Sequence, residues 1–285
     1  MNHAELTRAW VVAIEAAHRA GALMARQVHR TKVIKVSSQH DIKLELDERC
    51  QRLIEAHLSR HFPAVSILGE EGVLGDPESE YRWVVDPIDG TVNFTYGLPQ
   101  ACVSIALQGR KRLAAKPPAK NSVSDADYQT LVGVVYDPFR AETFNAIRGR
   151  RAEVNNRRLR VSQRTKLDEA ILSIGFAKHR KSLELMLPVF TQLVHRVRKI
   201  RIMGAAALDM VYVAGGRMDA YVESGLRLWD IAAGGLILEC AGGDFRRQAI
   251  AGPPHSYAVV ASNGQLEASL RNVTRKVLPK TPRAL

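Results

Sequence analysis

Cysteine is scarce in this sequence. Cys50, Cys102 and Cys240 are odd in number and share no metal-ligand spacing, which excludes a disulfide-stapled miniprotein and favours a reducing compartment. Apolar residues, by contrast, make up 46% of the 285 positions. The chain can therefore bury a core, and the disordered and collagen-like classes are excluded. Its length suits one large domain or two closely joined halves.

Long hydrophobic runs are absent as well. The longest uncharged run, 90–109, is interrupted by polar residues and by Pro99, so it does not predict a membrane span. An apolar patch at 9–14 lies between Glu5 and Glu15 and precedes no small-residue cleavage site, unlike the core of a signal peptide. We therefore expect a cytoplasmic protein with no membrane partner.

Acidic residues are in the minority, and their distribution is uneven. The net charge is +12, yet residues 41–89 hold twelve of the 29 acidic residues and only five of the 41 basic ones. A carboxylate-rich segment inside a basic protein indicates a cation site that serves an anionic ligand. A nucleic-acid partner is a second interpretation that this distribution does not favour.

Hydrophobic periodicity predicts alternating helices and strands along most of the chain. Apolar residues recur every three or four positions in 3–30, which predicts an amphipathic helix. Asp47 stands at the expected N-cap of a second helix that ends before Pro63. The polar segment 109–129 is typical of a surface loop. Strands are expected at 33–36, 42–46, 65–68, 81–85, 102–107, 131–136 and 143–147.

The second part of the chain alternates more regularly. The expected elements are strands at 170–176, 200–203, 218–223 and 257–261 and helices at 182–199, 205–214, 230–241 and 265–278. No internal repeat or linker separates the two parts. We therefore expect one α/β domain over 1–285, made of two halves, 1–165 and 166–285.

Carboxylates follow apolar strands in three places. Glu70 comes after 65–68, Asp86 and Asp89 come after the strand ending at Val85, and Asp230 opens a later helix. Ligands bind at strand ends in open α/β sheets, and gathered carboxylates repel one another unless a cation intervenes. Oxygen-only ligands suit Mg²⁺ or Mn²⁺ rather than zinc. Each motif alone is more typical of an ordinary turn or helix cap, and only their combination indicates a metal site.

Gly90 and Thr91 complete the 86–91 motif with a different chemistry. Backbone N–H groups at such a turn or helix start attract phosphate oxygens. Carboxylates for metal beside amides for phosphate indicate metal-assisted hydrolysis of a phosphate ester.

Three segments make the chain similar to a known family. GEEG at 69–72, WVVDPIDGTVNF at 83–94 and WDIAAGGLILECAGG at 229–243 resemble the motifs of the inositol monophosphatase family. The resemblance implies a layered α-β-α-β-α fold of mixed α/β class. It also implies a phosphomonoesterase that uses two or three Mg²⁺ ions, or Mn²⁺, to activate the attacking water. Members are usually homodimeric and often lithium-sensitive.

The resemblance also assigns roles to individual positions. It implies metal ligation by Glu70, Asp86, the carbonyl of Ile88, Asp89 and Asp230. Thr91 and Asp47 would orient the attacking water. The phosphate and substrate positions it implies are Asp89, Gly90, Thr91, Gly204, Ala205, Ala206, Glu223 and Asp230.

Departures from the family pattern bear on the substrate. Ala205 replaces the usual Thr or Ser, so one hydroxyl near the substrate is missing. Asn156 stands where glycine is usual and tolerates a left-handed backbone, whereas the residue pattern offers no account of Arg151. Inositol 1-phosphate is the first expectation. Alternatives are fructose 1,6-bisphosphate, histidinol phosphate and adenosine 3′,5′-bisphosphate, or a role in binding RNA or a transcription complex.

Two other groups of residues have simpler interpretations. His57 and His61 are the only histidines at helical i, i+4 spacing, and we expect them to lie at the surface or near the helix C-terminus. The basic clusters at 148–164 and 196–201 are expected to be solvated faces.

Overall fold

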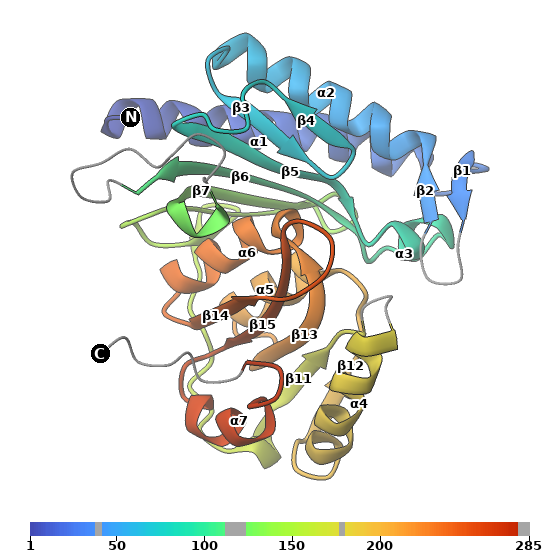
Figure 1. The fold of residues 1–285 in the computed structure, drawn as a ribbon, viewed down its shortest axis with the longest axis vertical. Helices are drawn as coiled ribbons and strands as arrows, with labels where there is room; N and C mark the ends of the chain where they lie inside the picture. The colour runs from blue at the N-terminus through green and yellow to red at the C-terminus, as the bar shows by residue number, and fades with distance from the viewer. Residues whose placement is uncertain (38–41, 112–123, 177–179, 279–285) are drawn as a thin grey trace.

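Five layers of alternating helices and sheets build the molecule. The computed structural model describes residues 1–37, 42–111, 124–176 and 180–278. From one end to the other, a helical pair is followed by an eight-stranded sheet, a second helical pair, a five-stranded sheet and a third helical pair (Figure 1). The expected α-β-α-β-α arrangement is confirmed.

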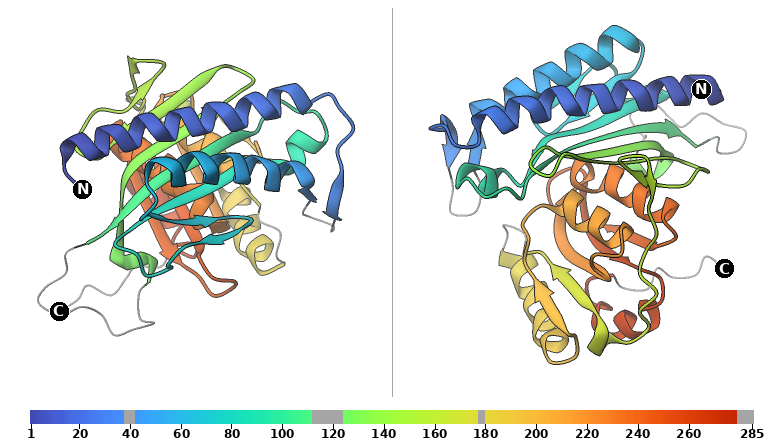
Figure 2. Two further views of the ribbon diagram at one scale, coloured as in Figure 1. Left: turned by 90° about the horizontal axis from the view of Figure 1, so that it is seen from above. Right: turned by 180° about the vertical axis from the view of Figure 1, so that it is seen from behind.

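The first two layers contain most of the N-terminal residues. Helices α1 (His3–Gln27) and α2 (Glu45–His61) lie side by side on the outer face of the eight-stranded sheet (Figure 2). The strands in spatial order are β10 (Arg157–Arg158), β9 (Glu153–Val154), β8 (Glu142–Ile147), β7 (Tyr128–Asp137), β6 (Cys102–Arg110), β5 (Tyr81–Asp89), β3 (Ser66–Gly69) and β4 (Gly72–Leu74). A separate hairpin, β1 (Ile34–Ser37) and β2 (Ile42–Leu44), and the short helix α3 (Thr91–Thr95) lie at one end.

The remaining layers come from the C-terminal residues. Helices α5 (Ala206–Ala214) and α6 (Leu228–Cys240) lie between the two sheets. The five-stranded sheet has the order β12 (Lys199–Arg201), β11 (Ile171–Ile174), β13 (Ala220–Arg227), β15 (Ser256–Ser262) and β14 (Asp244–Ala249). Helices α4 (Arg180–Val194) and α7 (Glu267–Val273) cover its far side (Figure 1). None of the helices in the described residues is long and apolar enough to cross a membrane.

Small residues allow α6 to lie pressed between the two sheets. A Cβ added to Gly133 of β7 would lie 2.8 Å from the carbonyl oxygen of Ala233, so helix and strand are in direct backbone contact. A Cβ on Gly235 would lie 2.5 Å from the ring of Phe245. Because a side chain at either position would clash, the close packing of α6 between the two sheets requires Gly133 on β7 and Gly235 on α6.

The structure corrects several of the expected elements. Helix α2 begins at Glu45, with Leu44 as its N-cap, so Asp47 is the third helical residue rather than the cap. Likewise α6 begins at Leu228, two residues before Asp230. Strand β14 was not expected. Residues 112–123 of the expected 109–129 loop lie outside the described residues. Of the remaining positions, 109–110 belong to β6 and 128–129 belong to β7.

Candidate active site

Four elements bring five carboxylates together in one buried place. Asp47 comes from the first turn of α2, Glu70 directly follows β3, Asp86 and Asp89 belong to β5, and Asp230 lies in the first turn of α6. Asp86 is 2% exposed. Burial raises its pKa well above the usual range, and the charges of the other four carboxylates raise it further. The five side chains therefore surround a common space centred on Asp86.

Strand pairing explains why Glu70 lies beside Asp86. Strands β3 and β5 are parallel neighbours, with Gly69 opposite Val85. The Glu70 N–H donates to the Val85 carbonyl at 3.1 Å, which extends the ladder by one residue. The carboxylates of Glu70 and Asp86 therefore project from neighbouring strands at the same edge of the sheet.

The two aspartates of the 86–91 motif lie in a bulge rather than in a turn. Strand β5 continues to Asp89, and the register shifts between Asp86, opposite Ser104, and Asp89, opposite Cys102. The extra residue re-aims the side chains locally. The Asp86 Oδ1 also accepts the Ile88 N–H at 3.0 Å. The expectation that the strand ends before this motif is wrong, because the ladder resumes beyond Pro87.

Asp89 connects β5 to the start of α5. Its carboxylate accepts the N–H groups of Ala206 and Ala207, at 3.2 and 2.8 Å, and the thiol of Cys102 at 3.6 Å. It thereby caps α5, whose own N-cap residue, Ala205, offers no side-chain hydrogen bond. Burial raises the pKa of Asp89 to about 7, even though these three donors act in the opposite direction.

Gly90 brings the phosphate-type turn against the start of α5. Its φ of +89° lies in the region that favours glycine. A Cβ there would lie 2.7 Å from the carbonyl oxygen of Gln100 and 3.1 Å from the Cβ of Ala205. Thr91 begins α3, and its hydroxyl donates to the Ile88 carbonyl at 2.9 Å. The structure therefore places Gly90 and Thr91 beside the carboxylates.

Asn93 attaches residues 203–204 to the same turn. Its Nδ2 donates to the carbonyls of Met203 and Gln100, at 2.8 and 2.9 Å, and more weakly to that of Gly204 at 3.3 Å. Because Gly204, Ala205 and Ala206 follow directly, all three lie next to Gly90. The expected substrate positions on α5 and the 86–91 motif thus share one site.

Glu223 lies close enough to Asp209 of α5 for its charge to raise the pKa of that residue, as the charge of Asp89 does. It accepts a hydrogen bond from the hydroxyl of Tyr221. Its carboxylate occupies space that any side chain at Gly175 would fill, since a Cβ there would lie 1.6 Å from its Oε2. Of the expected substrate residues, Glu223 is the one that β13 contributes.

Asp209 is a carboxylate that the sequence analysis missed. It is 2% exposed on α5. Burial raises its pKa well above the usual range, a hydrogen bond with Ser173 opposes this, and the charges of Glu223 and Asp89 raise it further. Asp209 therefore lies between these two site residues. The available signal was a single acid inside the otherwise apolar segment 206–214.

The donor chemistry of the cluster fits a hard divalent cation. Carboxylate oxygens and backbone carbonyls are the ligands that Mg²⁺ takes in proteins. Buried carboxylates with raised pKa values are a costly arrangement that a cation relieves. The residues that could supply these oxygens are Glu70, Asp86, Ile88, Asp89 and Asp230.

Residues outside the site differ in how well they match expectation. Asn155 and Asn156 both adopt positive φ angles, as proposed for Asn156. Arg151 is exposed and its Nε donates to Glu153 at 2.7 Å, which explains why an arginine is tolerated there. His57 is only 7% exposed, so the expected surface position is wrong for this residue.

Comparisons with known proteins identify relatives over nearly the whole chain. A model of the inositol monophosphatase family matches residues 5–278. The protein named Nus factor SuhB of Pseudomonas aeruginosa is 41% identical over 240 residues, which are 81% of this chain and 82% of that one. The protein named inositol monophosphatase 1 of Solanum lycopersicum is 36% identical over 239 residues, 81% of each chain.

Solved structures agree with these matches. The extragenic suppressor protein suhB from Bartonella henselae superposes with a TM-score of 0.80 at 29% identity, covering 96% of this chain and all of the other. The inositol monophosphatase from Anabaena (Nostoc) superposes with a TM-score of 0.76 at 32% identity, covering 98% and 99%.

Proposed function

We propose, because the chain belongs to the inositol monophosphatase family, that it is a Mg²⁺-dependent phosphatase of small phosphate monoesters, with inositol 1-phosphate as its first substrate. The observation that carries this proposal is the cluster of five carboxylates around Asp86, next to the Gly90–Thr91 turn and the N-terminus of α5. Carboxylates repel a phosphate group that is bound by neighbouring backbone amides. The two kinds of group can therefore act in one site only when a cation lies between them.

The carboxylates hold the ions in this proposal. Glu70, Asp86, Asp89 and Asp230, with the Ile88 carbonyl, supply the oxygens for two or three Mg²⁺ ions, and Mn²⁺ is an equivalent occupant. Bound Mg²⁺ supplies Lewis-acid polarisation of the phosphate and activation of water.

Thr91 and Asp47 position the attacking water. The Thr91 hydroxyl donates its proton to the Ile88 carbonyl, so that its oxygen lone pairs can accept a hydrogen bond from water. One oxygen of Asp47 accepts the Leu44 N–H at 2.7 Å and thereby fixes the carboxylate at the start of α2. The pair holds water in line with phosphorus.

The phosphate and the polyol contact different parts of the site. The backbone N–H groups of Gly90 and Thr91 donate to the phosphate oxygens. Glu223 accepts hydrogen bonds from substrate hydroxyls, and residues 204–206 form the adjoining wall. Because Ala205 has no hydroxyl, recognition of the polyol depends on Glu223 more than on this wall.

Phosphate release by the purified protein tests the proposal. The substrates are inositol 1-phosphate, fructose 1,6-bisphosphate, histidinol phosphate and adenosine 3′,5′-bisphosphate, each with Mg²⁺, with and without lithium. Asp86→Asn is the inactive blank, and Asp168→Asn, at an exposed acid outside the site, is the matched control. We expect turnover in the wild type and in Asp168→Asn only. Equal turnover by Asp86→Asn would refute the assignment.

A second candidate function is binding to RNA in a transcription complex. Relatives such as the Pseudomonas protein are named Nus factors, and Arg196, Arg198, Lys199 and Arg201 form an exposed basic run around β12. Phosphate contacts by such residues give binding that falls steeply with salt. The test is RNA binding by the inactive Asp86→Asn protein at about 0.15 M salt, against an Arg196→Glu/Lys199→Glu derivative. Loss of binding only in the derivative supports this role.

We further propose that the protein is a homodimer. Tyr96, Leu98 and Ile202 are 76%, 53% and 62% exposed. Asn93 connects the α3 region to residues 203–204, so these apolar side chains lie in neighbouring segments. Sedimentation of the wild type against an Ile202→Lys variant tests this: we expect a dimer that the variant dissociates, whereas a monomeric wild type contradicts it.

A further inference from the structure

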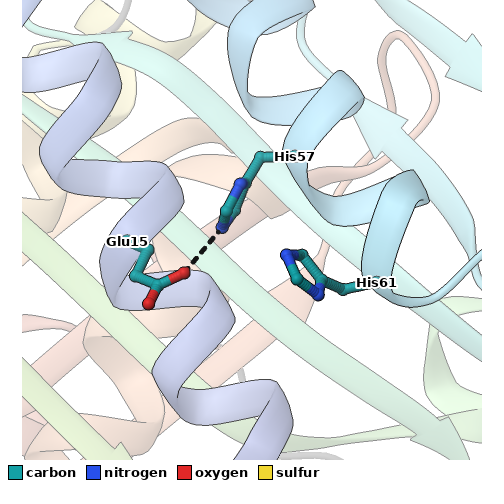
Figure 3. Close-up of side chains that lie close together, drawn as sticks. All are labelled: Glu15, His57 and His61. Carbon is teal, nitrogen blue, oxygen red and sulfur yellow. Dashed lines mark hydrogen bonds and ion pairs between the residues drawn. The ribbon is translucent and has the colours of Figure 1, made fainter.

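A second group of metal-type side chains lies away from the carboxylates. Glu15 on α1 and His57 and His61 on α2 face one another across the helix pair (Figure 3). His57 follows Asp47 by ten residues on the same helix, a separation of about 15 Å at 1.5 Å per residue. This group is therefore distinct from the candidate active site.

The three side chains already converge. One donor atom from each lies within 4.8 Å of the others. The Nε2 of His57 and the Oε2 of Glu15 are 3.0 Å apart. The two imidazole rings, one helical turn apart on α2, have centroids separated by 4.8 Å. Spacing i, i+4 on one helix with a third ligand from a neighbouring helix is a suitable arrangement for a metal ion.

Burial and charge leave His57 ready to donate a lone pair. Its side chain is 6% exposed. Burial lowers its pKa and the charge of Arg19 lowers it further, although Glu15 opposes this. Both influences favour the neutral imidazole, the form in which histidine binds metals. The negative charge of Glu15 attracts a bound cation and so offsets its repulsion by Arg19.

The other two side chains have freedom to adjust. The Glu15 side chain is 52% exposed and His61 is half-buried. The backbone of His61 is held, because Arg8 donates to its carbonyl at 3.1 Å and stacks on Phe62. Tetrahedral ligands about 2.0–2.1 Å from zinc lie about 3.3 Å apart. Because more than half of the Glu15 side chain is exposed, its carboxylate has room to rotate towards the two imidazoles.

We propose that Glu15, His57 and His61 form a zinc site that joins α1 to α2. Two imidazoles and one carboxylate suit Zn²⁺ or a similar transition-metal ion and not Mg²⁺, which prefers oxygen ligands. In this proposal the protein holds two sites of different chemistry, one of oxygen donors alone at the start of α2 and one with two nitrogen donors at its end.

Zinc binding is tested on the full-length protein by competition with a chromophoric chelator, in excess Mg²⁺ that fills the oxygen site. The variants are Glu15→Gln and His61→Ala, both at side chains that are not fully buried, so that folding is preserved. His195→Ala, at an exposed histidine on the opposite side of the molecule, is the matched control. Co²⁺ added in place of zinc gives a visible absorption spectrum that reports tetrahedral nitrogen and oxygen ligands.

We expect one equivalent of zinc in the wild type and in His195→Ala, and about tenfold or greater loss of affinity in the other two variants. Zinc should also raise the melting temperature of the wild type and the control by several degrees, but not that of Glu15→Gln or His61→Ala. Equal zinc binding by all four proteins, or none by the wild type, would overturn the proposal.

Discussion

The buried carboxylates make the metal-free protein less stable as pH rises. The pKa of Asp89 is about 7, roughly three units above its ordinary value, and one unit corresponds to about 1.4 kcal/mol. Between these two pKa values the folded chain holds protons that the unfolded chain has lost. The contribution of Asp89 to stability is therefore full below about pH 4 and falls as the pH rises towards 7, by about 4 kcal/mol.

Asp86→Asn should relieve this repulsion. Four other carboxylates raise the pKa of Asp86, and the variant keeps an oxygen that can accept the Ile88 N–H. We expect the free energy of unfolding of the chelated variant to exceed that of the chelated wild type by about 2–4 kcal/mol at pH 8. At pH 4 the difference should be small, because Asp86 of the wild type then holds its proton and adds no charge to the cluster.

Urea unfolding in the presence of a chelator measures this difference. Asp168→Asn serves as the control, and Mg²⁺ should stabilise the wild type far more than Asp86→Asn. A chelated Asp86→Asn protein that is less stable than the chelated wild type at pH 8 would show that the cluster is not repulsive. The electrostatic argument for a cation would then fail.

Three further predictions concern single side chains. Gly90→Ala should destabilise the protein by about 1–3 kcal/mol in urea unfolding, since its Cβ would meet the Gln100 carbonyl at a positive φ. Thr91→Ala should lower kcat at least about tenfold with little change in KM, whereas Thr91→Ser should retain kcat; an effect on KM alone would contradict water positioning. Tyr257→Phe removes one donor to Asp125 and should cost about 1.5–3 kcal/mol at pH 7. Burial raises the pKa of Asp125, but its three donors hold it well below the usual range, so this stability is present above about pH 4 and lost as pH falls.

Much of the layered fold follows from patterns within single elements. The period of α1 is visible because the helix packs one apolar face on the core, whereas β5 to β8 are visible as short apolar runs because they are buried on both faces of the sheet. Strand β14 was missed because its residues Asp244–Ala249 are charged and half-buried on both faces, as is usual for the edge of a sheet. Hydrophobic periodicity reveals an element only where part of its surface is buried, and an edge strand buries little of its surface.

The site was easier to anticipate than its local geometry. Pro87 and Gly90 are typical of a turn, yet the ladder resumes at Asp89 through its pairing with Cys102. Asp209 is a lone acid in an apolar helix, and nothing local reveals that it lies between two site residues. His57 and His61 show their spacing in the sequence, but their partner Glu15 is 42 residues away from His57. Local sequence patterns therefore do not predict contacts between elements that are far apart in the sequence.

The close contact of α6 with both sheets distinguishes two kinds of residue in the 229–243 motif, those that packing requires and the one that metal binding requires. Packing requires the two glycines, since a Cβ on Gly235 would meet the ring of Phe245 and a Cβ on Gly234 would lie 3.0 Å from Met210. Asp230 is instead the residue of this motif that we propose as a metal ligand. A relative that lost catalysis and gained another function would keep the small residues, because the fold requires them, and could replace the acid. Among relatives named as inositol monophosphatases and as Nus factors, we therefore expect Asp230 to be retained wherever catalysis is retained.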